Sequence, residues 1–182
     1  THRVSALRTL AFPGPSIKAP PLGALPFGAR VTVVRTQGPF AVTDTGAFLP
    51  ARHLAPVDSV ETDFVAVAER FVGAPYLWGG KTVLGIDCSG LVQVALSACG
   101  LACPRDSDMQ ERALGAALDP AASKDLRRGD LVFWKGHVAI VRDPETLLHA
   151  NAFHMAVVAE PLAPALERIG AAAGEPTAVK RL

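Results

Sequence analysis

The spacing of hydrophobic and polar positions changes along the chain, and the change predicts two kinds of structure. The first third has short β-branched and aromatic runs at residues 30–35, 40–43 and 47–49, set between prolines and glycines. Short runs separated by turn residues are typical of a small all-β barrel. We expect this barrel over residues 1–57 and a linker over residues 58–61.

After the linker the apolar residues recur with helical spacing. One face of an amphipathic helix is formed by Phe64, Val67, Ala68, Phe71 and Val72. We expect Thr62 to cap this helix, and Gly73 to end it. A second helix is predicted from Asp87 to about Cys99, capped by Asp87 or Ser89, and a third over residues 107–114.

From residue 130 onwards the period becomes that of strands. Strands are predicted over residues 131–134, 137–142, 146–150, 155–160 and 177–181, with a helical segment over 161–169. Helices followed by a run of strands predict an α+β domain over residues 62–182.

Composition excludes several classes of protein. Apolar residues make up 49% of the 182 residues, which is enough for a sizeable core. A net charge of +1 and 6% aromatic residues argue against a nucleic-acid partner, which calls for basic and stacking side chains. The apolar runs fall short of the roughly 18 residues of a membrane helix, so we expect no membrane partner either.

Cys88 differs from the other two cysteines in its surroundings. Cys99 and Cys103 lie among alanines and leucines and are interpreted as small core residues, whereas Cys88 stands at the start of a predicted helix. The positive end of the helix dipole and its free N–H groups favour the thiolate form. Position alone gives about equal weight to a buried structural cysteine.

Two histidines provide candidate bases. His137 begins one apolar strand and His149 ends the next, and antiparallel pairing of these strands would set the two imidazoles side by side. A cysteine, a base and a polar group that orients the base make a nucleophilic site. A metal site built from His137, His149 and His154 lacks a carboxylate at ligand spacing, so we expect neither a metal nor a cofactor.

Five segments together carry a resemblance to a known family. They are residues 75–80 (PYLWGG), 85–92 (GIDCSGLV), 126–134, 137–140 and 149–151. In order and spacing the chain resembles the NlpC family of papain-like cell-wall cysteine peptidases, in which helices pack on an antiparallel sheet. Residues 1–57 more weakly resemble the bacterial SH3-like barrel that often precedes this domain.

The resemblance implies roles for individual residues. Cys88 would be the nucleophile, His137 the general base and later acid, and His149 the residue that orients His137, with Asn151 as the runner-up; His154 is interpreted as structural or solvent-facing. The implied substrates are peptidoglycan-derived peptides, cut between γ-D-glutamate and a diamino acid, with a free N-terminal L-alanine. The implied substrate-binding residues are Tyr76, Trp78, Asp87, Ser89, Asp106 and Ser107.

A carboxylate beside the nucleophile raises a question of charge. Asp87 disfavours a thiolate on Cys88, and we hypothesise that the substrate's ammonium group neutralises it. In relatives the barrel lends acidic and tyrosine side chains to the amine pocket, but Tyr76 is the only tyrosine here, which leaves Asp44 as a candidate. The free-amine requirement is therefore less firmly implied than the peptidase chemistry.

Two other functions stay open. The same scaffold serves amidases and acyltransferases, and a non-catalytic module could bind cell-wall peptides. A need for free L-alanine and a free thiol point to the cytoplasm of a bacterium, or to the periplasm or exterior if a leader is removed.

Overall fold

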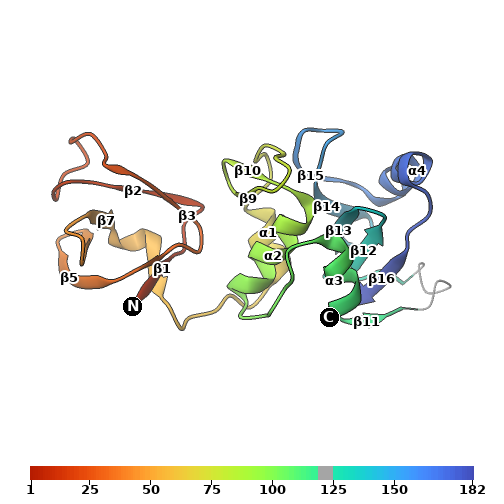
Figure 1. The fold of residues 1–182 in the computed structure, drawn as a ribbon, viewed down its shortest axis with the longest axis horizontal. Helices are drawn as coiled ribbons and strands as arrows, with labels where there is room; N and C mark the ends of the chain where they lie inside the picture. Colours follow the sequence, from red (N-terminus) through yellow and green to blue (C-terminus); the bar gives the residue numbers. More distant parts are fainter. Residues whose placement is uncertain (119–124) are drawn as a thin grey trace. The chain divides into compact units, whose positions relative to one another are not determined.

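The computed structural model describes residues 1–118 and 125–182, and the chain divides into two compact units, Thr1–Val60 and Glu61–Leu182. The first unit is all-β apart from one 3-10 turn (Figure 1). Its elements are β1 (His2–Val4), β2 (Arg8–Ala11), β3 (Gly23–Pro26), β4 (Arg30–Val31), β5 (Val33–Gln37), β6 (Phe40–Thr43), β7 (Phe48–Pro50), η1 (Ala51–His53) and β8 (Leu54–Pro56). They form three small antiparallel sheets, in the orders β4-β1-β8, β2-β3 and β5-β6-β7.

Phenylalanines form a core in this first unit. Phe12, Phe40, Val42 and Phe48 are buried together, and the ring of Phe40 meets those of Phe12 and Phe48 edge-on at 6.2 and 6.3 Å between centroids. The run predicted over residues 30–35 is divided at Thr32, because Arg30–Val31 pair with β1 whereas Val33–Gln37 pair with β6. The unit is all-β as expected, and its assignment to the SH3-like type stays a prediction.

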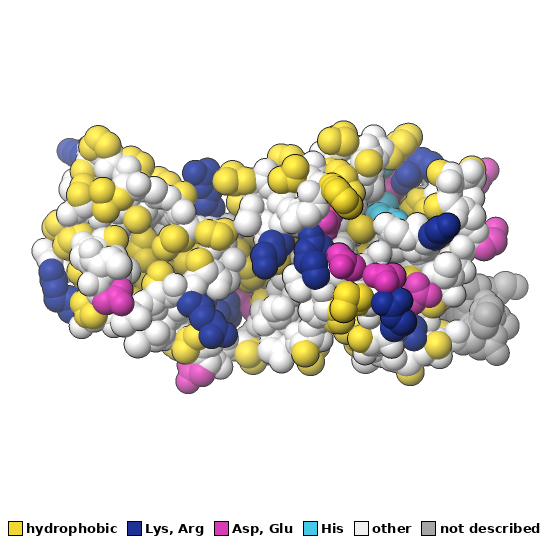
Figure 2. Space-filling model, in the orientation of Figure 1, with side chains coloured by type: hydrophobic (Ala, Val, Ile, Leu, Met, Phe, Trp, Pro, Cys, Tyr) yellow, Lys and Arg dark blue, Asp and Glu magenta, His cyan; other side chains and the backbone are white. Residues whose placement is uncertain are grey.

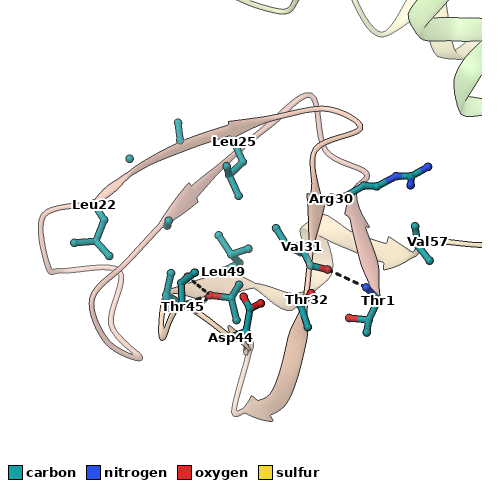
Figure 3. Close-up of a pocket in the computed structure, with 15 residues that line it drawn as sticks. Thr1, Leu22, Leu25, Arg30, Val31, Thr32, Asp44, Thr45, Leu49 and Val57 are labelled. Atoms are coloured by element: carbon teal, nitrogen blue, oxygen red, sulfur yellow. Dashed lines mark hydrogen bonds between the residues drawn. The ribbon is translucent and has the colours of Figure 1, made fainter.

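The first unit also encloses an open hollow of about 710 Å³ (Figure 3). Leu22, Leu25 and Leu49 line it together with Asp44, which is exposed. The amino group of Thr1 donates a hydrogen bond to the carbonyl of Val31 at 3.2 Å on its wall. The hollow is mainly apolar, with a single acidic side chain among its lining residues.

The second unit contains a six-stranded antiparallel sheet in the order β11-β16-β12-β13-β14-β15. Its elements are α1 (Phe64–Glu69), β9 (Lys81–Thr82), β10 (Gly85–Ile86), α2 (Cys88–Ala98), α3 (Ser107–Ala113), β11 (Ala116–Ala117), β12 (Leu131–Trp134), β13 (His137–Asp143), β14 (Thr146–Asn151), β15 (Ala156–Pro161), α4 (Leu162–Ala173) and β16 (Ala178–Arg181). Helices and an antiparallel sheet in one unit confirm the predicted α+β class.

Both faces of this sheet are covered. Val141 and Leu147 pack with Trp134 against Ala165 and Ile169 of α4. Since neighbouring side chains of a strand point to opposite faces, the alternate residues of β13 face the other side, where α2 packs. The strands are buried on both faces, which explains why β12 and β13 have continuous apolar sequences.

The first helix is shorter than its sequence pattern predicts. Asp63, not Thr62, is the N-cap, because its carboxylate accepts hydrogen bonds from the N–H groups of Val65 and Ala66. The helix ends at Glu69, and Val72 is 51% exposed, so it does not belong to the buried face. The strands β9, β10 and β11 have two residues each, too few to produce a periodic pattern.

Two further properties concern the described residues as a whole. None of their helices combines the length and the apolar character needed to cross a bilayer. In the same residues, no group of three or more His, Cys, Asp and Glu side chains is arranged to hold a metal ion.

Candidate active site

Cys88 is the first residue of α2, a helix that packs against β13. Asp87 is the N-cap, and its Oδ1 accepts the N–H of Gly90 at 2.7 Å. The helix therefore begins where the sequence predicts, with Asp87 rather than Ser89 as its cap. This cap fixes the first turn and so fixes the direction of the Cys88 side chain.

The sulfur of Cys88 lies against the start of β13. The backbone N–H groups of Val138, the residue that follows His137, and of Ser89 and Cys88 itself lie near this sulfur and lower the pKa of the thiol. Burial raises the pKa of the thiol, and the charge of Asp87 raises it further. Together they outweigh the N–H groups, which lower this pKa. The expectation of a thiolate at the helix start is therefore wrong for the resting protein.

Three glycines allow the loop before Cys88 to pack closely. A Cβ on Gly80 would clash with the carbonyl of Gly85, and a Cβ on Gly85 with the side chain of Leu77. A Cβ on Gly90 would clash with the carbonyl oxygen of Gly80 and lie 2.8 Å from Oδ1 of Asp87. The role of Gly90 is thus to admit the loop backbone.

The two histidines meet as the strand pattern predicts. Nε2 of His137 is 2.8 Å from Nδ1 of His149, and the ring centroids are 5.0 Å apart. Burial lowers the pKa of His137 to about 3, and repulsion from His149 and from the positive charge of Arg168 contributes to this shift. Burial also lowers the pKa of His149. Both imidazoles are therefore neutral near pH 7, and Nδ1 of His137 is the ring nitrogen that His149 does not occupy.

A carboxylate that the sequence pattern did not predict contacts His149 on the side away from His137. Oε1 of Glu160 is 2.6 Å from Nε2 of His149, and the guanidinium of Arg168 also donates to this oxygen. Burial alone would raise the pKa of Glu160, but the hydrogen bonds from His149 and Arg168 outweigh it and lower the pKa. Glu160 is opposite Leu147 in the β14–β15 ladder, two positions from His149. Only this register could have pointed to it.

Asn151 and His154 complete the surroundings of His149. Oδ1 of Asn151 accepts the backbone N–H of His154 at 2.8 Å, and Nδ2 of Asn151 lies 3.0 Å from Nε2 of His149. Nδ1 of His154 is 3.1 Å from Oδ1 of Asn151 and 3.9 Å from Oε1 of Glu160. Figure 2 shows imidazole atoms at the surface of this unit.

Arg105 already neutralises Asp87. Its Nη1 and Nη2 donate to the two carboxylate oxygens at 2.9 and 2.6 Å, and Nη1 also donates to Oγ of Ser89 at 2.9 Å. Burial would raise the pKa of Asp87, but Arg105 and the N–H groups of Gly79 and Gly90 lower it. The hypothesis that a substrate ammonium is needed to neutralise Asp87 is therefore wrong, and the buried carboxylate is already fully hydrogen-bonded.

The remaining predicted binding residues differ in exposure. Tyr76 is half-buried, and burial raises the pKa of its hydroxyl, with smaller contributions from the nearby Cys88 and Asp87. Trp78 is 88% exposed, so it is not a core residue. Asp106 is exposed and Ser107 half-buried; Asp106 stands at the N-cap of α3 without a side-chain capping bond. The residue of this segment that reaches Asp87 is Arg105.

The other two cysteines are less buried than expected. Cys99 and Cys103 are partly exposed, so they are not core residues, and all three thiols are free. Burial raises the pKa of Cys103 to about 11, although the side-chain amide of Gln110 donates to its sulfur. Gln110 is fully buried and also donates to the carbonyl of Ser89, which ties α3 to the first turn of α2.

Comparison with known proteins places these residues in one family. The model of the NlpC/P60 family matches residues 73–165, which contain Cys88, both histidines of the pair and Glu160. Dipeptidyl-peptidase 6 of Lysinibacillus sphaericus is 34% identical over 101 residues, 56% of this chain and 36% of that protein. A gamma-D-glutamyl-L-lysine dipeptidyl-peptidase of Bacillus cereus is 30% identical over 141 residues, 73% of this chain and 41% of that protein. The chain thus spans less than half the length of these two relatives.

A solved structure shares the fold. A crystal structure of an NlpC/P60 family protein from Bacillus cereus matches 99% of this chain and 62% of its own chain, with a TM-score of 0.78 and 24% identity. The family model covers just over half of the chain and includes Cys88, His137 and His149. The chain belongs to the NlpC/P60 family.

Proposed function

We propose that this protein is a cysteine endopeptidase that hydrolyses the bond between γ-D-glutamate and a diamino acid in peptidoglycan-derived peptides. The observation that carries the proposal is the position of Cys88, which lies close enough to the N–H of Val138, the residue after His137, for that N–H to lower the pKa of the thiol, while Nε2 of His137 is 2.8 Å from Nδ1 of His149. The similarity to gamma-D-glutamyl-L-lysine dipeptidyl-peptidases of B. cereus and Bacillus subtilis supports this substrate class.

The first half-reaction forms an acyl-enzyme. Nδ1 of His137 accepts the proton of the Cys88 thiol as the sulfur attacks the γ-carbonyl carbon of D-glutamate. The backbone N–H groups at the first turn of α2 stabilise the oxyanion. The C–N bond then breaks, the proton on His137 passes to the amine of the diamino acid, and a thioester remains on Cys88.

The second half-reaction uses the same base. Nδ1 of His137 accepts a proton from water as the water oxygen attacks the thioester carbon. The C–S bond breaks, the proton returns to sulfur, and the γ-carboxyl of D-glutamate leaves. A neutral thiol and a neutral imidazole are thus the resting state at both ends of the cycle, in agreement with the raised pKa of Cys88 and the lowered pKa of His137.

Substrate recognition is assigned to the surroundings of Cys88. Tyr76 and Trp78, on the segment before it, present aromatic faces to the peptide; Asp106 and Ser107 stay proposed contacts. Asp87 acts indirectly, because Arg105 and backbone N–H groups already occupy its oxygens. We therefore propose that Asp87 and Ser89 stabilise the structure around Cys88 and do not contact the peptide. Oγ of Ser89 accepts a hydrogen bond from the same guanidinium of Arg105.

Digestion of defined peptides tests this function. L-Ala-γ-D-Glu-L-Lys and its N-acetyl form are incubated with the protein, and the products are identified by mass. We expect free lysine and L-Ala-D-Glu from the first peptide. Cleavage at the L-Ala–D-Glu bond, or of simple esters and amides alone, would contradict the proposal and favour the amidase or acyltransferase alternative.

A further inference from the structure

The hydrogen-bond chain from His137 continues beyond His149 to two competing partners. Nε2 of His149 is 2.6 Å from Oε1 of Glu160 and 3.0 Å from Nδ2 of Asn151. A carboxylate only accepts hydrogen bonds, whereas an amide NH₂ only donates them. The two neighbours therefore require opposite protonation states of the same nitrogen.

The orientation of the Asn151 side-chain amide is fixed, so Asn151 cannot act as an acceptor toward His149. Oδ1 of Asn151 accepts the backbone N–H of His154 at 2.8 Å, so the NH₂ group is the part that faces His149. Rotating the amide by 180° would point its NH₂ group at the N–H of His154. Asn151 is thus fixed as a donor toward Nε2 of His149.

Charge and distance decide in favour of Glu160. Its bond to Nε2 is shorter by 0.4 Å than that of Asn151, and charge-assisted hydrogen bonds are stronger than neutral ones. Arg168 holds the carboxylate from α4, its guanidinium lies 4.4 Å from the ring centroid of Phe153, and His154 faces the same oxygen at 3.9 Å. Nε2 of His149 therefore carries the proton and donates it to Glu160.

The tautomer of His149 determines that of His137. With its proton on Nε2, His149 presents an unprotonated Nδ1, which accepts the Nε2–H of His137 at 2.8 Å. Nδ1 of His137 is then free of a proton. If Asn151 prevailed instead, both rings would carry their protons on Nδ1, and His137 would have no lone pair left to accept a proton from the thiol.

We propose that Glu160, held in place by Arg168, is a positioning residue that selects the tautomers in which Nδ1 of His137 can accept the thiol proton, against the competing amide of Asn151. The inference rests on the proposed function in that Cys88 is the proton donor. It concerns the resting protein, however, and its test needs no substrate.

Ring ¹⁵N chemical shifts of the histidines test the proposal directly. In the wild-type protein we expect the proton on Nε2 of both His137 and His149. In Glu160→Leu, Asn151 becomes the remaining partner of Nε2, and both protons are expected to move to Nδ1. Wild-type rings protonated on Nδ1, or a Glu160→Leu variant with unchanged tautomers, would overturn the proposal. The wild-type spectrum decides by itself if Glu160→Leu does not fold.

A relocated carboxylate gives the sharpest control. Asn151→Asp places an acceptor 3.0 Å from Nε2 of His149 while keeping the oxygen that accepts the N–H of His154. The double variant Glu160→Leu/Asn151→Asp is therefore expected to return both rings to the Nε2–H form. Failure to restore these tautomers in the folded double variant would show that Glu160 does not act by accepting from His149.

Kinetics with the peptide substrate give a second readout. Glu160→Leu should lower kcat by about 100-fold with KM unchanged, and the double variant should recover most of that loss. Glu167→Leu, at an exposed position next to Arg168, is the matched control and should leave kcat and the tautomers unchanged. If the predicted tautomers are found but the wild type cleaves no peptide, the proposed function fails and the tautomer selection stands. A change of KM alone in Glu160→Leu, with kcat unchanged, would contradict the selection of the tautomers by Glu160.

Discussion

The two units of this chain bury different kinds of residue. The first, fully described unit has two threonines as its buried polar residues, Thr9 and Thr43, around a phenylalanine core. In the described part of the second unit the buried polar residues are Asp87, Ser89, Gln110, Asp130, His149 and Asn151. Burying such groups costs free energy unless each is hydrogen-bonded. Of the six in the described part of the second unit, His149 belongs to the histidine pair, and Asp87, Ser89 and Asn151 lie beside Cys88 or this pair.

One of these buried groups lies apart from the site and serves as an internal reference. Asp130 accepts two hydrogen bonds from Arg181 at 2.7 Å each, as Asp87 does from Arg105. The two pairs have the same chemistry, but only the second lies beside the nucleophile. Comparing them separates a contribution to stability from a contribution to catalysis.

The largest expected effect is the removal of the base. His137→Ala should lower kcat for the γ-D-Glu–diamino acid peptide by about 1000-fold, because it removes the proposed acceptor of the thiol proton. His53→Ala, which removes the imidazole bonded to Thr9 in the first unit, is the control and should leave kcat unchanged. Equal activity of wild type and His137→Ala, measured by product mass, would remove His137 from the mechanism.

Breaking the two ion pairs sharpens the comparison. Asp87→Asn and Asp130→Asn should each lower the free energy of unfolding by about 3 kcal/mol at pH 7, because each leaves a guanidinium without its carboxylate. Only Asp87→Asn should also lower kcat. Urea unfolding and peptide turnover measure the two effects, and an active, folded Asp87→Asn variant would contradict the supporting role of Asp87.

The same pair makes a pH-dependent contribution to stability. The pKa of Asp87 is lowered in the folded protein, so its contribution is complete above the unfolded pKa of about 3.9 and is lost as the pH falls through the folded pKa. The difference in unfolding free energy between wild type and Asp87→Asn should therefore be constant from pH 7 to about 5 and narrow below about 4. A difference that grows toward acidic pH would contradict the sign of this shift.

Two glycine substitutions should change the free energy of unfolding in opposite directions. Gly90→Ala should lower the free energy of unfolding by about 2 kcal/mol, because the new methyl group meets the carbonyl oxygen of Gly80. Gly170→Ala, in α4, meets nothing within 4 Å and should raise it by up to about 1 kcal/mol through helix propensity. Thermal unfolding measures both, and a stabilising Gly90→Ala would disprove the close approach of the loop.

The smallest predicted effect concerns the resting thiol. Burial raises the pKa of Cys88, and the thiolate is the form that iodoacetamide alkylates. The alkylation rate should therefore keep rising at pH values above the pKa of an ordinary thiol, and it should show no plateau at acidic pH. A Cys99→Ser/Cys103→Ser background isolates the signal. A plateau between about pH 4 and 8 would indicate a thiolate–imidazolium pair and contradict the neutral resting state.

Local pattern predicted the longer elements and singled out Cys88, His137 and His149 as candidates, whereas their catalytic roles came from the resemblance to a family. Cys88 follows a capping aspartate and begins α2, and the antiparallel pairing of β13 with β14 brings His137, the first residue of β13, close to His149 in β14. The α+β class follows from the same periodicities. These features depend on neighbours within a few residues or on a short hairpin.

The partners that determine charge and tautomer could not be found in this way. Glu160 reaches His149 only through the register of β14 with β15, across a turn in which Met155 has a positive φ of 51°. Arg105 reaches Asp87 from an irregular segment before α3, which has no period to interpret. Burial, which raises the pKa of Cys88, is a property of the packed unit and not of the helix start.

The account depends most on the sulfur of Cys88. The direct test compares wild type, Cys88→Ala and Cys103→Ala for release of lysine from L-Ala-γ-D-Glu-L-Lys, with the folded state of each verified by circular dichroism. The account predicts release by wild type and Cys103→Ala and none by Cys88→Ala. Release by folded Cys88→Ala at the wild-type rate would contradict it.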